Sequence, residues 1–183
     1  LIPMYKGDCG INEINSRIQD IVNPQGEDVL EVKHYGRVFR ENDKVIQLVN
    51  RAEKGIMNGD VGYIESFIMK NLKVNGIRVC FDSNIVEYNL DELEDLSLAY
   101  AIRVHKAQGG EFDIVIMPVT NKHFIMLKRK LIYTAVTRAK KMVVLVGTKR
   151  AIRIMVSNNY TQIRYSMLKY FLKNVDIENT LLK

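Results

Sequence analysis

Two uninterrupted apolar runs near the end of the chain constrain its fold more than any other feature. Val115–Val119 and Met142–Val146 are rich in β-branched residues and carry no charge, which is typical of strands buried on both faces of a parallel sheet. Between the two runs, apolar residues recur at helical spacing, at Leu127, Leu131, Ile132, Ala135 and Val136. Strand, helix and strand in this order predict a parallel β-α-β unit.

The rest of the chain adds further α/β elements to this unit. Strands are expected at Leu1–Tyr5 and Leu98–Val104. Helices are expected at Ile11–Val22, Ala151–Val156 and Gln162–Leu172. The first of these helices is expected to end at Asn23-Pro24, which is a helix-ending signal. The predicted fold class is therefore α/β, with one open parallel sheet and helices on both of its faces.

A different pattern interrupts the α/β elements between about residues 36 and 96. Short strands bounded by turn residues are expected there, at Lys44–Val49, Val61–Ile68, Ile68–Val74, Ile77–Phe81 and Ile85–Leu90. Asn75-Gly76 is the strongest hairpin signal in the chain and predicts a turn just before Ile77. We therefore expect a small antiparallel barrel at 36–96, α/β parts at 1–35 and 97–173, and a frayed tail at 174–183.

Charge is unevenly distributed along the chain, although the net charge is +6. Residues 121–183 hold 14 basic and 2 acidic residues, whereas residues 1–95 hold 11 basic and 17 acidic ones. Such a basic final third predicts a polyanionic partner, most simply nucleic acid. The alternative is a solvated basic face.

Other features exclude several classes of protein. No apolar run approaches the roughly 20 residues that span a bilayer, so no membrane association is expected. The start lacks a basic leader and an initiator Met, and we expect the chain to be the interior of a longer one. Cys9 and Cys80 fit no metal-ligand spacing, so we expect reduced thiols in a cytoplasmic protein and no metal site.

Polar residues suited to chemistry accompany both apolar runs. His105–Glu111 follows an expected strand, and ligands of open α/β sheets bind at the carboxyl ends of the strands. On the helix that follows, Lys130, Thr134 and Arg138 are four residues apart and share a face that is not the apolar one. The sequence therefore predicts a binding site at the sheet edge near residues 105–111.

These stretches resemble motifs of superfamily 1 helicases. Tyr100–Asp113, YAIRVHKAQGGEFD, resembles motif V, and Leu131–Lys140, LIYTAVTRAK, resembles motif VI. Leu1–Gly7 and the helix after it resemble the segment that opens the later part of the second RecA-like domain in RecD-like helicases, and Lys54–Gly62 resembles their inserted SH3-like barrel. Because these stretches occur in the family's order, the chain is identified as a member of the RecD-like (RecD-TraA type) helicases.

The resemblance implies an ATP-dependent 5′→3′ DNA helicase, with ATP and Mg²⁺ bound mainly by an upstream RecA-like domain of the same chain. Arg138 matches the motif VI arginine, which faces the phosphate being transferred; the alternative is an ion pair with a surface carboxylate. Gln108, Gly109 and Glu111 match motif V positions that couple the nucleotide and DNA sites; the alternative is a turn at the start of a strand.

The same resemblance implies a track for single-stranded DNA. His105 and Lys106 match motif V positions near DNA, and Thr134 of motif VI is assigned to the same track. Met4 and Tyr5 match the opening segment, where Tyr5 is placed to stack on a base. The alternatives are a structural histidine at position 105 and a core aromatic at position 5. The family's partners also include subunits of a nuclease–helicase complex (exodeoxyribonuclease V) in DNA repair and recombination.

The chain departs from the family pattern in motif V, where Arg103, Ala107 and Gly110 replace hydroxyl residues, and these positions are not assigned as sites. The phosphate-binding loop G-x-x-x-x-G-K-[ST] occurs nowhere in the sequence, so we expect that the chain alone hydrolyses no ATP. Two alternatives stay open. One is a non-enzymatic nucleic-acid- or protein-binding module built on the barrel and the basic third. The other is a motor of opposite polarity or one that acts on RNA.

Overall fold

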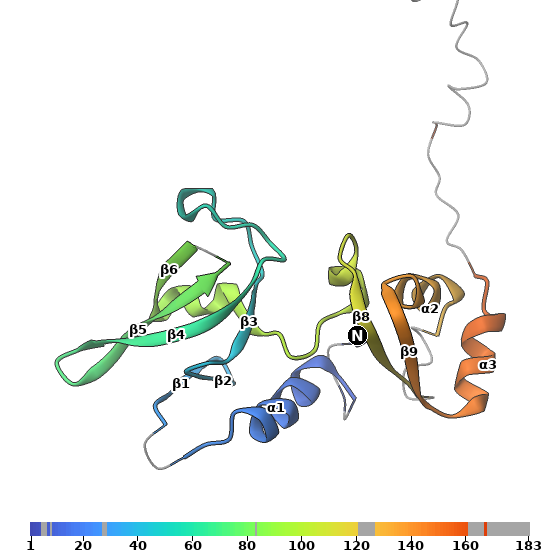
Figure 1. The fold of residues 1–183 in the computed structure, drawn as a ribbon, viewed down its shortest axis with the longest axis horizontal. Coiled ribbons are helices and arrows are strands. Elements are labelled where there is room, and N and C mark those ends of the chain that lie inside the picture. The colour runs from blue at the N-terminus through green and yellow to red at the C-terminus, as the bar shows by residue number, and fades with distance from the viewer. Residues whose placement is uncertain are drawn as a thin grey trace, which may run out of the picture.

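The structure, a computed structural model, describes residues 1–4, 7, 9–26, 29–82, 84–120, 127–160 and 167. Figure 1 shows an antiparallel barrel on one side, an α/β unit on the other, and helix α1 (Ile11–Val22) between them at the bottom of the view. This arrangement confirms the predicted class, an α/β fold with an inserted barrel. None of the described helices is long and apolar enough to cross a membrane.

The α/β unit is built on two parallel strands, β8 (Phe112–Val119) and β9 (Ala139–Gly147). Helix α2 (Arg129–Val136) precedes β9 in the chain, and helix α3 (Lys149–Ser157) follows it. Gly147 is required at the end of β9, because a Cβ there would lie 1.8 Å from the carbonyl oxygen of Val119. The strand–helix–strand order predicted from the two apolar runs is therefore confirmed.

The first residues of the chain extend the parallel arrangement on the other side of β8. The amino group of Leu1 donates to the carbonyl of Ile116 at 2.6 Å, and Ile2 forms a parallel bridge with Arg103. This contact is an isolated bridge, so the strands expected at Leu1–Tyr5 and Leu98–Val104 do not form as predicted. The segment that begins at Leu98 instead completes the barrel and then turns.

Among the described residues, helices pack closely on one face of the β8–β9 pair and not on the other. Met117 and Val119 of β8 pack with Leu131, Ala135 and Met155 of α2 and α3, and these side chains are all buried. The opposite face is open: Ile114, Ile116, Met142 and Val146 are each more than half exposed. The prediction that both apolar runs are buried on both faces is therefore wrong, because α1 and the barrel stand away from this face across a hollow of about 1050 Å³.

The barrel consists of a five-stranded antiparallel sheet and an accompanying hairpin. The sheet has the order β6-β5-β4-β3-β7, and the hairpin pairs β1 with β2. The strands are β1 (Glu31–His34), β2 (Arg37–Arg40), β3 (Lys44–Gln47), β4 (Val61–Lys70), β5 (Lys73–Phe81), β6 (Asn84–Asn89) and β7 (Leu96–Leu98). Short 3₁₀ helices, η1 (Ala52–Lys54) and η2 (Leu90–Asp95), link them. Their core includes Phe39, Val45, Ile77, Val79 and Tyr88, which have no exposed surface.

The turn between β4 and β5 differs from the prediction. The chain reverses at Asn71 and Leu72, both with positive φ (50° and 60°), whereas Asn75 and Gly76 lie inside β5. Gly76 serves a different purpose there, since a Cβ would lie 2.3 Å from the carbonyl oxygen of Tyr88 on β6. Packing against the neighbouring strand thus decided the register over the local turn preference of Asn-Gly.

The strands of the barrel extend beyond 36–96 at both ends. β1 begins at Glu31, before the predicted start of the barrel, and its Val32 joins the barrel core. β7 pairs with β3 through Leu98. The division into domains at 35/36 and 96/97 stays a prediction. The expected helix at Gln162–Leu172, the tail at 174–183 and Tyr5 lie outside the described residues.

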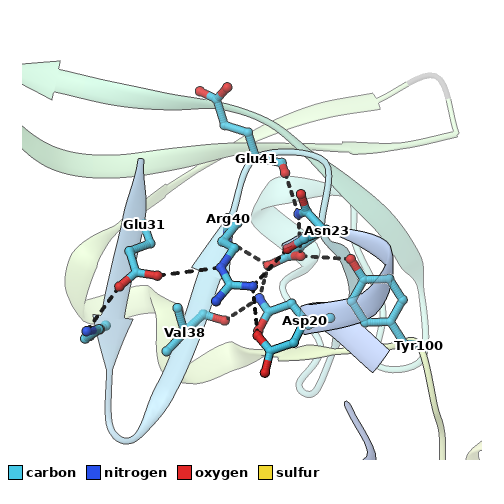
Figure 2. A network of polar contacts seen from close by, with 10 residues as sticks. Asp20, Asn23, Glu31, Val38, Arg40, Glu41 and Tyr100 are labelled. Carbon is cyan, nitrogen blue, oxygen red and sulfur yellow. Dashed lines mark hydrogen bonds and ion pairs between the residues drawn. The ribbon is translucent and has the colours of Figure 1, made fainter. Parts of the chain in front are cut away.

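A buried carboxylate ties α1 to the barrel. Asp43 has no exposed surface and accepts four hydrogen bonds, two at each oxygen. The donors are the Gln19 and Asn23 side chains of α1, the Arg40 backbone N–H and the Tyr100 hydroxyl, at 2.5, 2.8, 2.7 and 2.8 Å. Figure 2 shows this network, in which the Arg40 guanidinium also meets Asp20 and Glu31.

Candidate functional site

Helix α1 positions the segment that leads into the candidate site. Asn15, which is only 2% exposed, donates to the carbonyls of Leu98 and Ala101 at 3.1 and 3.0 Å and accepts from the Ala101 N–H at 2.7 Å. The Tyr100 hydroxyl holds the same segment to Asp43, and its burial and this contact raise the pKa of Tyr100 to about 12. The approach to residues 103–111 is therefore fixed from both α1 and the barrel.

Residues 104–107 form a single 3₁₀ turn, η3 (Val104–Ala107), that displays the expected polar residues. Val104 and Ala107 are buried, whereas His105 and Gln108 are exposed and Lys106 is half-buried. The alternation follows from the turn itself, which is closed by hydrogen bonds from the N–H groups of residues 106 and 107 to the Arg103 carbonyl. Gly109 follows with φ of +87°, a conformation that favours glycine.

The exposed residues of this turn face the central hollow, the space of about 1050 Å³ between the barrel, α1 and the open face of β8. His105, Lys106 and Gln108 line it on one side, and Asn58 and Gly59 of the barrel line it on another. Lys106 donates to the side-chain oxygen of Asn58, which links the turn to the barrel. Burial, and then the charge of Arg103, lower the pKa of Lys106.

Arg138 lies between α2 and β9 and brings the two polar stretches together. Its Nη1 donates to the Gly110 carbonyl at 3.3 Å, and its Nη2 contacts the Thr137 hydroxyl at 3.4 Å. The Arg138 carbonyl also accepts from the Phe112 N–H at 2.8 Å. Its Nε is buried and has no hydrogen-bond partner within the described residues. The guanidinium is therefore placed beside residues 110–112 by two long hydrogen bonds and keeps an unused donor.

Charged residues surround Arg138 at the surface. Lys140 pairs with Glu111 at 3.2 Å and Lys141 with Asp113 at 2.8 Å, and all four side chains are more than half exposed. Exposed pairs of this kind contribute little stability. The Lys140–Glu111 pair places the Glu111 carboxylate next to β9, close to the backbone of Arg138.

The remaining predicted residues do not gather at one place. Met4 caps α1 with its backbone carbonyl, which accepts from the Ile11 N–H at 3.0 Å. Thr134 is half-buried on α2, and its hydroxyl donates to the Lys130 carbonyl of the same helix at 2.9 Å. Tyr5 lies outside the described residues. Arg138, Gly110 and Glu111 thus adjoin, whereas His105, Lys106 and Gln108 face the hollow.

Sequence reasoning missed the residues that hold these parts in place. Asn15 and Gln19 sit on the apolar stripe of α1, at i+4 from Ile11 and from each other, and a polar residue on such a stripe is a signal of a buried hydrogen bond. Asn58 is not among the predicted site residues, and nothing in the sequence shows that its side chain meets Lys106, 48 positions later.

Two further observations concern metals and thiols. Among the residues that the structure describes, no three His, Cys, Asp or Glu side chains come together as metal ligands. Cys9 and Cys80 are both free cysteines and both half-buried.

Comparisons with known protein families agree in two separate parts of the chain. Residues 14–81 match the family described as "ATP-dependent RecD-like DNA helicase SH3 domain". Residues 98–146 match the "UvrD-like helicase C-terminal domain". The first match spans most of α1 and most of the barrel, and the second contains residues 103–111 and Arg138.

Curated relatives align over most of the chain. The ATP-dependent RecD2 DNA helicase of Deinococcus radiodurans is 39% identical over 142 residues, which is 76% of this chain and 18% of that protein. The RecBCD enzyme subunit RecD of Buchnera aphidicola subsp. Schizaphis graminum is 27% identical over 150 residues, 78% of this chain and 23% of that protein. The chain thus spans about a fifth of the length of these relatives.

Solved structures share the fold. Bacteroides Pif1 bound to ssDNA superposes with a TM-score of 0.55 at 19% identity, over 93% of this chain and 44% of that one. Pif1 helicase from Candida albicans gives a TM-score of 0.57 at 15% identity, over 94% and 49%. The α/β unit and the barrel therefore occur together in these solved structures.

Proposed function

Because this chain belongs to the RecD-like helicases of superfamily 1, we propose that it supplies the second RecA-like domain of an ATP-dependent 5′→3′ DNA helicase. The observation that carries the proposal is the position of Arg138 against Gly110, which joins the two motif-bearing stretches at one edge of the sheet. ATP with Mg²⁺ supplies the phosphoryl group and its activation, and both are held mainly by an upstream RecA-like domain.

Arg138 is proposed to place its guanidinium against the phosphate being transferred. Cationic charge fixed at this point stabilises the charge that develops on the phosphoryl oxygens. The two long hydrogen bonds and the unused Nε support this role, since little is lost when the side chain turns from Gly110 to an anion. Gln108, Gly109 and Glu111 are proposed to connect this edge to the DNA track.

The central hollow is proposed as part of the single-strand track. His105 and Lys106 bring polar and basic groups to its wall, and an enzyme that moves along DNA contacts phosphates without reading the sequence. A Pif1 neighbour of the same fold is described with ssDNA, which supports this use of the fold. Met4, Tyr5 and Thr134 stay proposals for the same track.

Charge favours a second candidate function, a nucleic-acid-binding module without chemistry of its own. Residues 127–160 contain nine Lys and Arg and no Asp or Glu. Single-strand binding that weakens steeply with salt, in a protein that lacks DNA-stimulated ATP hydrolysis, would favour this candidate. A protein-binding role for the barrel predicts association that is insensitive to salt.

The partners of the whole protein are proposed from its relatives. One relative is named as a subunit of the RecBCD enzyme, and another is named as an ATP-dependent DNA helicase. We accordingly propose the upstream RecA-like domain and single-stranded DNA as partners in every case. If the whole protein belongs to a nuclease–helicase complex, the other subunits of that complex are further partners.

Single-strand-stimulated ATP hydrolysis by the full-length polypeptide tests the role of Arg138. Arg138→Ala is expected to reduce turnover by at least a hundredfold, a threshold set below the roughly 10³–10⁵ that such arginines contribute, while DNA binding is retained. Arg150→Ala, an exposed arginine on α3, is the matched control and should retain turnover. The isolated 183-residue chain should hydrolyse no ATP. If Arg138→Ala and Arg150→Ala both retain the wild-type turnover, Arg138 has no catalytic role.

A further inference from the structure

A small cavity beside the central hollow carries an unusual set of charges. Its volume is about 110 Å³, and it lies where α1 begins and where β2, β7 and the segment before η3 meet. We call it the basic cavity and define it by its polar lining residues, Asn12, Arg37, Ser97, Arg103 and Lys106. Apolar residues form the rest of its described lining.

Three cations share this space. Arg37 comes from the β1–β2 hairpin of the barrel, whereas Arg103 and Lys106 come from the motif V segment more than sixty residues later. No carboxylate is found among the described lining residues. The pKa of Lys106 is lowered by burial and, next, by the charge of Arg103, so the two cations oppose each other. An anion placed between them would relieve this repulsion.

The cavity also offers oriented hydrogen-bond donors. Arg37 is held in place through Nη1 alone, which donates to the carbonyls of Leu96 at 2.5 Å and Glu94 at 3.3 Å. Its Nε and Nη2 donate to no acceptor in the described part of the chain. Lys106 uses one of its three N–H groups on Asn58. The remaining donors suit the oxygens of a phosphate, which arginine contacts with two parallel hydrogen bonds.

The surroundings favour a phosphate over a base. None of the described lining residues is aromatic, and bases of a single strand are held by aromatic stacking. The basic cavity adjoins the central hollow, because Ala101, Ile102 and Lys106 line both. The cavity therefore lies beside the path of a strand that passes His105 and Gln108 in the hollow.

We propose that the basic cavity binds one phosphodiester group of single-stranded DNA between Arg37, Arg103 and Lys106. The inference rests on the proposed function and extends it to a barrel residue, Arg37, and to Arg103, which stands where the family commonly has threonine. The barrel then does more than support the fold: it closes one side of a phosphate clamp whose other side is motif V.

Binding of a fluorescein-labelled oligothymidylate to the full-length protein, measured over about 50–200 mM salt, tests the clamp. Arg37→Gln is expected to weaken binding about tenfold, because one charged hydrogen-bonded contact is lost. It should also reduce the slope of log K against log salt by about 0.7, the value for one phosphate of a single strand. Arg37→Lys keeps the charge and should keep the slope.

The matched control is Arg78→Gln, which makes the same change on the outer surface of the barrel, where Arg78 pairs with Glu87. It should leave affinity and slope as in the wild type. Because Arg37 and Lys106 serve one phosphate, the double variant Arg37→Gln/Lys106→Gln should lose less affinity than the product of the two single losses.

Three outcomes would overturn the clamp. If Arg37→Gln behaves as Arg78→Gln while the wild type binds DNA, the cavity holds no phosphate and the proposed function stands. If affinity falls but the slope does not change, Arg37 only supports the barrel. If the wild-type protein does not bind the single strand at all, the proposed function fails together with the clamp.

Discussion

Replacing Asp43 by asparagine should destabilise the protein nearly as much as removing the side chain. Each carboxylate oxygen accepts two hydrogen bonds: Oδ1 from Asn23 and Tyr100, and Oδ2 from Gln19 and the Arg40 N–H. Asparagine has one oxygen and one amide NH₂ in their place. In either orientation of its amide, two buried donors therefore face another donor.

The expected magnitude follows from these contacts. Two hydrogen bonds to a charged acceptor are lost, each worth about 1.5–3 kcal/mol, and the two remaining ones become neutral. The relief of a buried charge offsets part of this loss, so the free energy of unfolding should fall by about 3–5 kcal/mol. For a chain of this length the melting temperature should fall by roughly 10 °C.

Urea unfolding measures this change. The chain contains nine tyrosines and no tryptophan, so far-UV circular dichroism and tyrosine fluorescence are the probes. Asp91→Asn is the matched control, because Asp91 is exposed on η2 and makes no hydrogen bond or ion pair with the described residues. If Asp43→Asn lies within about 1 kcal/mol of Asp91→Asn, the account of Asp43 as the joint between α1 and the barrel is refuted.

Two further predictions concern neighbouring features. The pKa of Tyr100 is raised from 10.0 to about 12, so the contribution of its protonated hydroxyl to stability is present below pH 10 and lost as pH rises through 12. In urea titrations, the difference in unfolding free energy between wild type and Tyr100→Phe should therefore shrink from pH 10 to 12. A difference that stays constant over this range would contradict the assignment. Gly76→Ala should lower the unfolding free energy by about 3 kcal/mol, because its Cβ would meet the Tyr88 carbonyl, whereas Gly110→Ala, with ordinary contacts of 3.6 Å and longer, should cost far less.

Local patterns predicted the elements whose residues decide their own structure. The helix at Ile11–Val22 has the predicted bounds, because its apolar spacing and the Asn23-Pro24 stop agree. The two strands after it in the α/β unit follow from their β-branched runs. The run of short strands bounded by turn residues predicted correctly that a barrel interrupts this unit.

Features that depend on distant parts of the chain could not be predicted in this way. Asn75-Gly76 favours a turn, but the close approach of Tyr88 on another strand requires glycine within the strand. Asp43 lies in a polar stretch of the sequence that does not indicate burial. Its burial depends on hydrogen-bond donors that are distant in the chain, such as the Gln19 amide and the Tyr100 hydroxyl. The open face of β8 and β9 likewise depends on where α1 and the barrel stand, which no local pattern specifies.

The candidate site likewise contains residues that the sequence predicted and residues that only the fold identifies. Arg138 and residues 105–111 were found from their motif context, and the structure places Arg138 against Gly110. Arg37 lies in no recognised motif, and Asn58 lies in the Lys54–Gly62 stretch without an assigned role; both meet the site only because the fold brings the barrel beside motif V. Their assignment therefore depends on the arrangement of the two parts.

The most direct test of the central claim is strand separation by the full-length polypeptide on duplexes with a single-stranded tail. We predict that ATP drives unwinding of a DNA duplex with a 5′ tail, that a 3′-tailed duplex stays intact, and that Arg138→Ala abolishes unwinding while the protein still binds the tail. Unwinding from the 3′ tail would assign the opposite polarity. ATP-independent binding without unwinding of either substrate would contradict the account and leave the chain as a nucleic-acid-binding module.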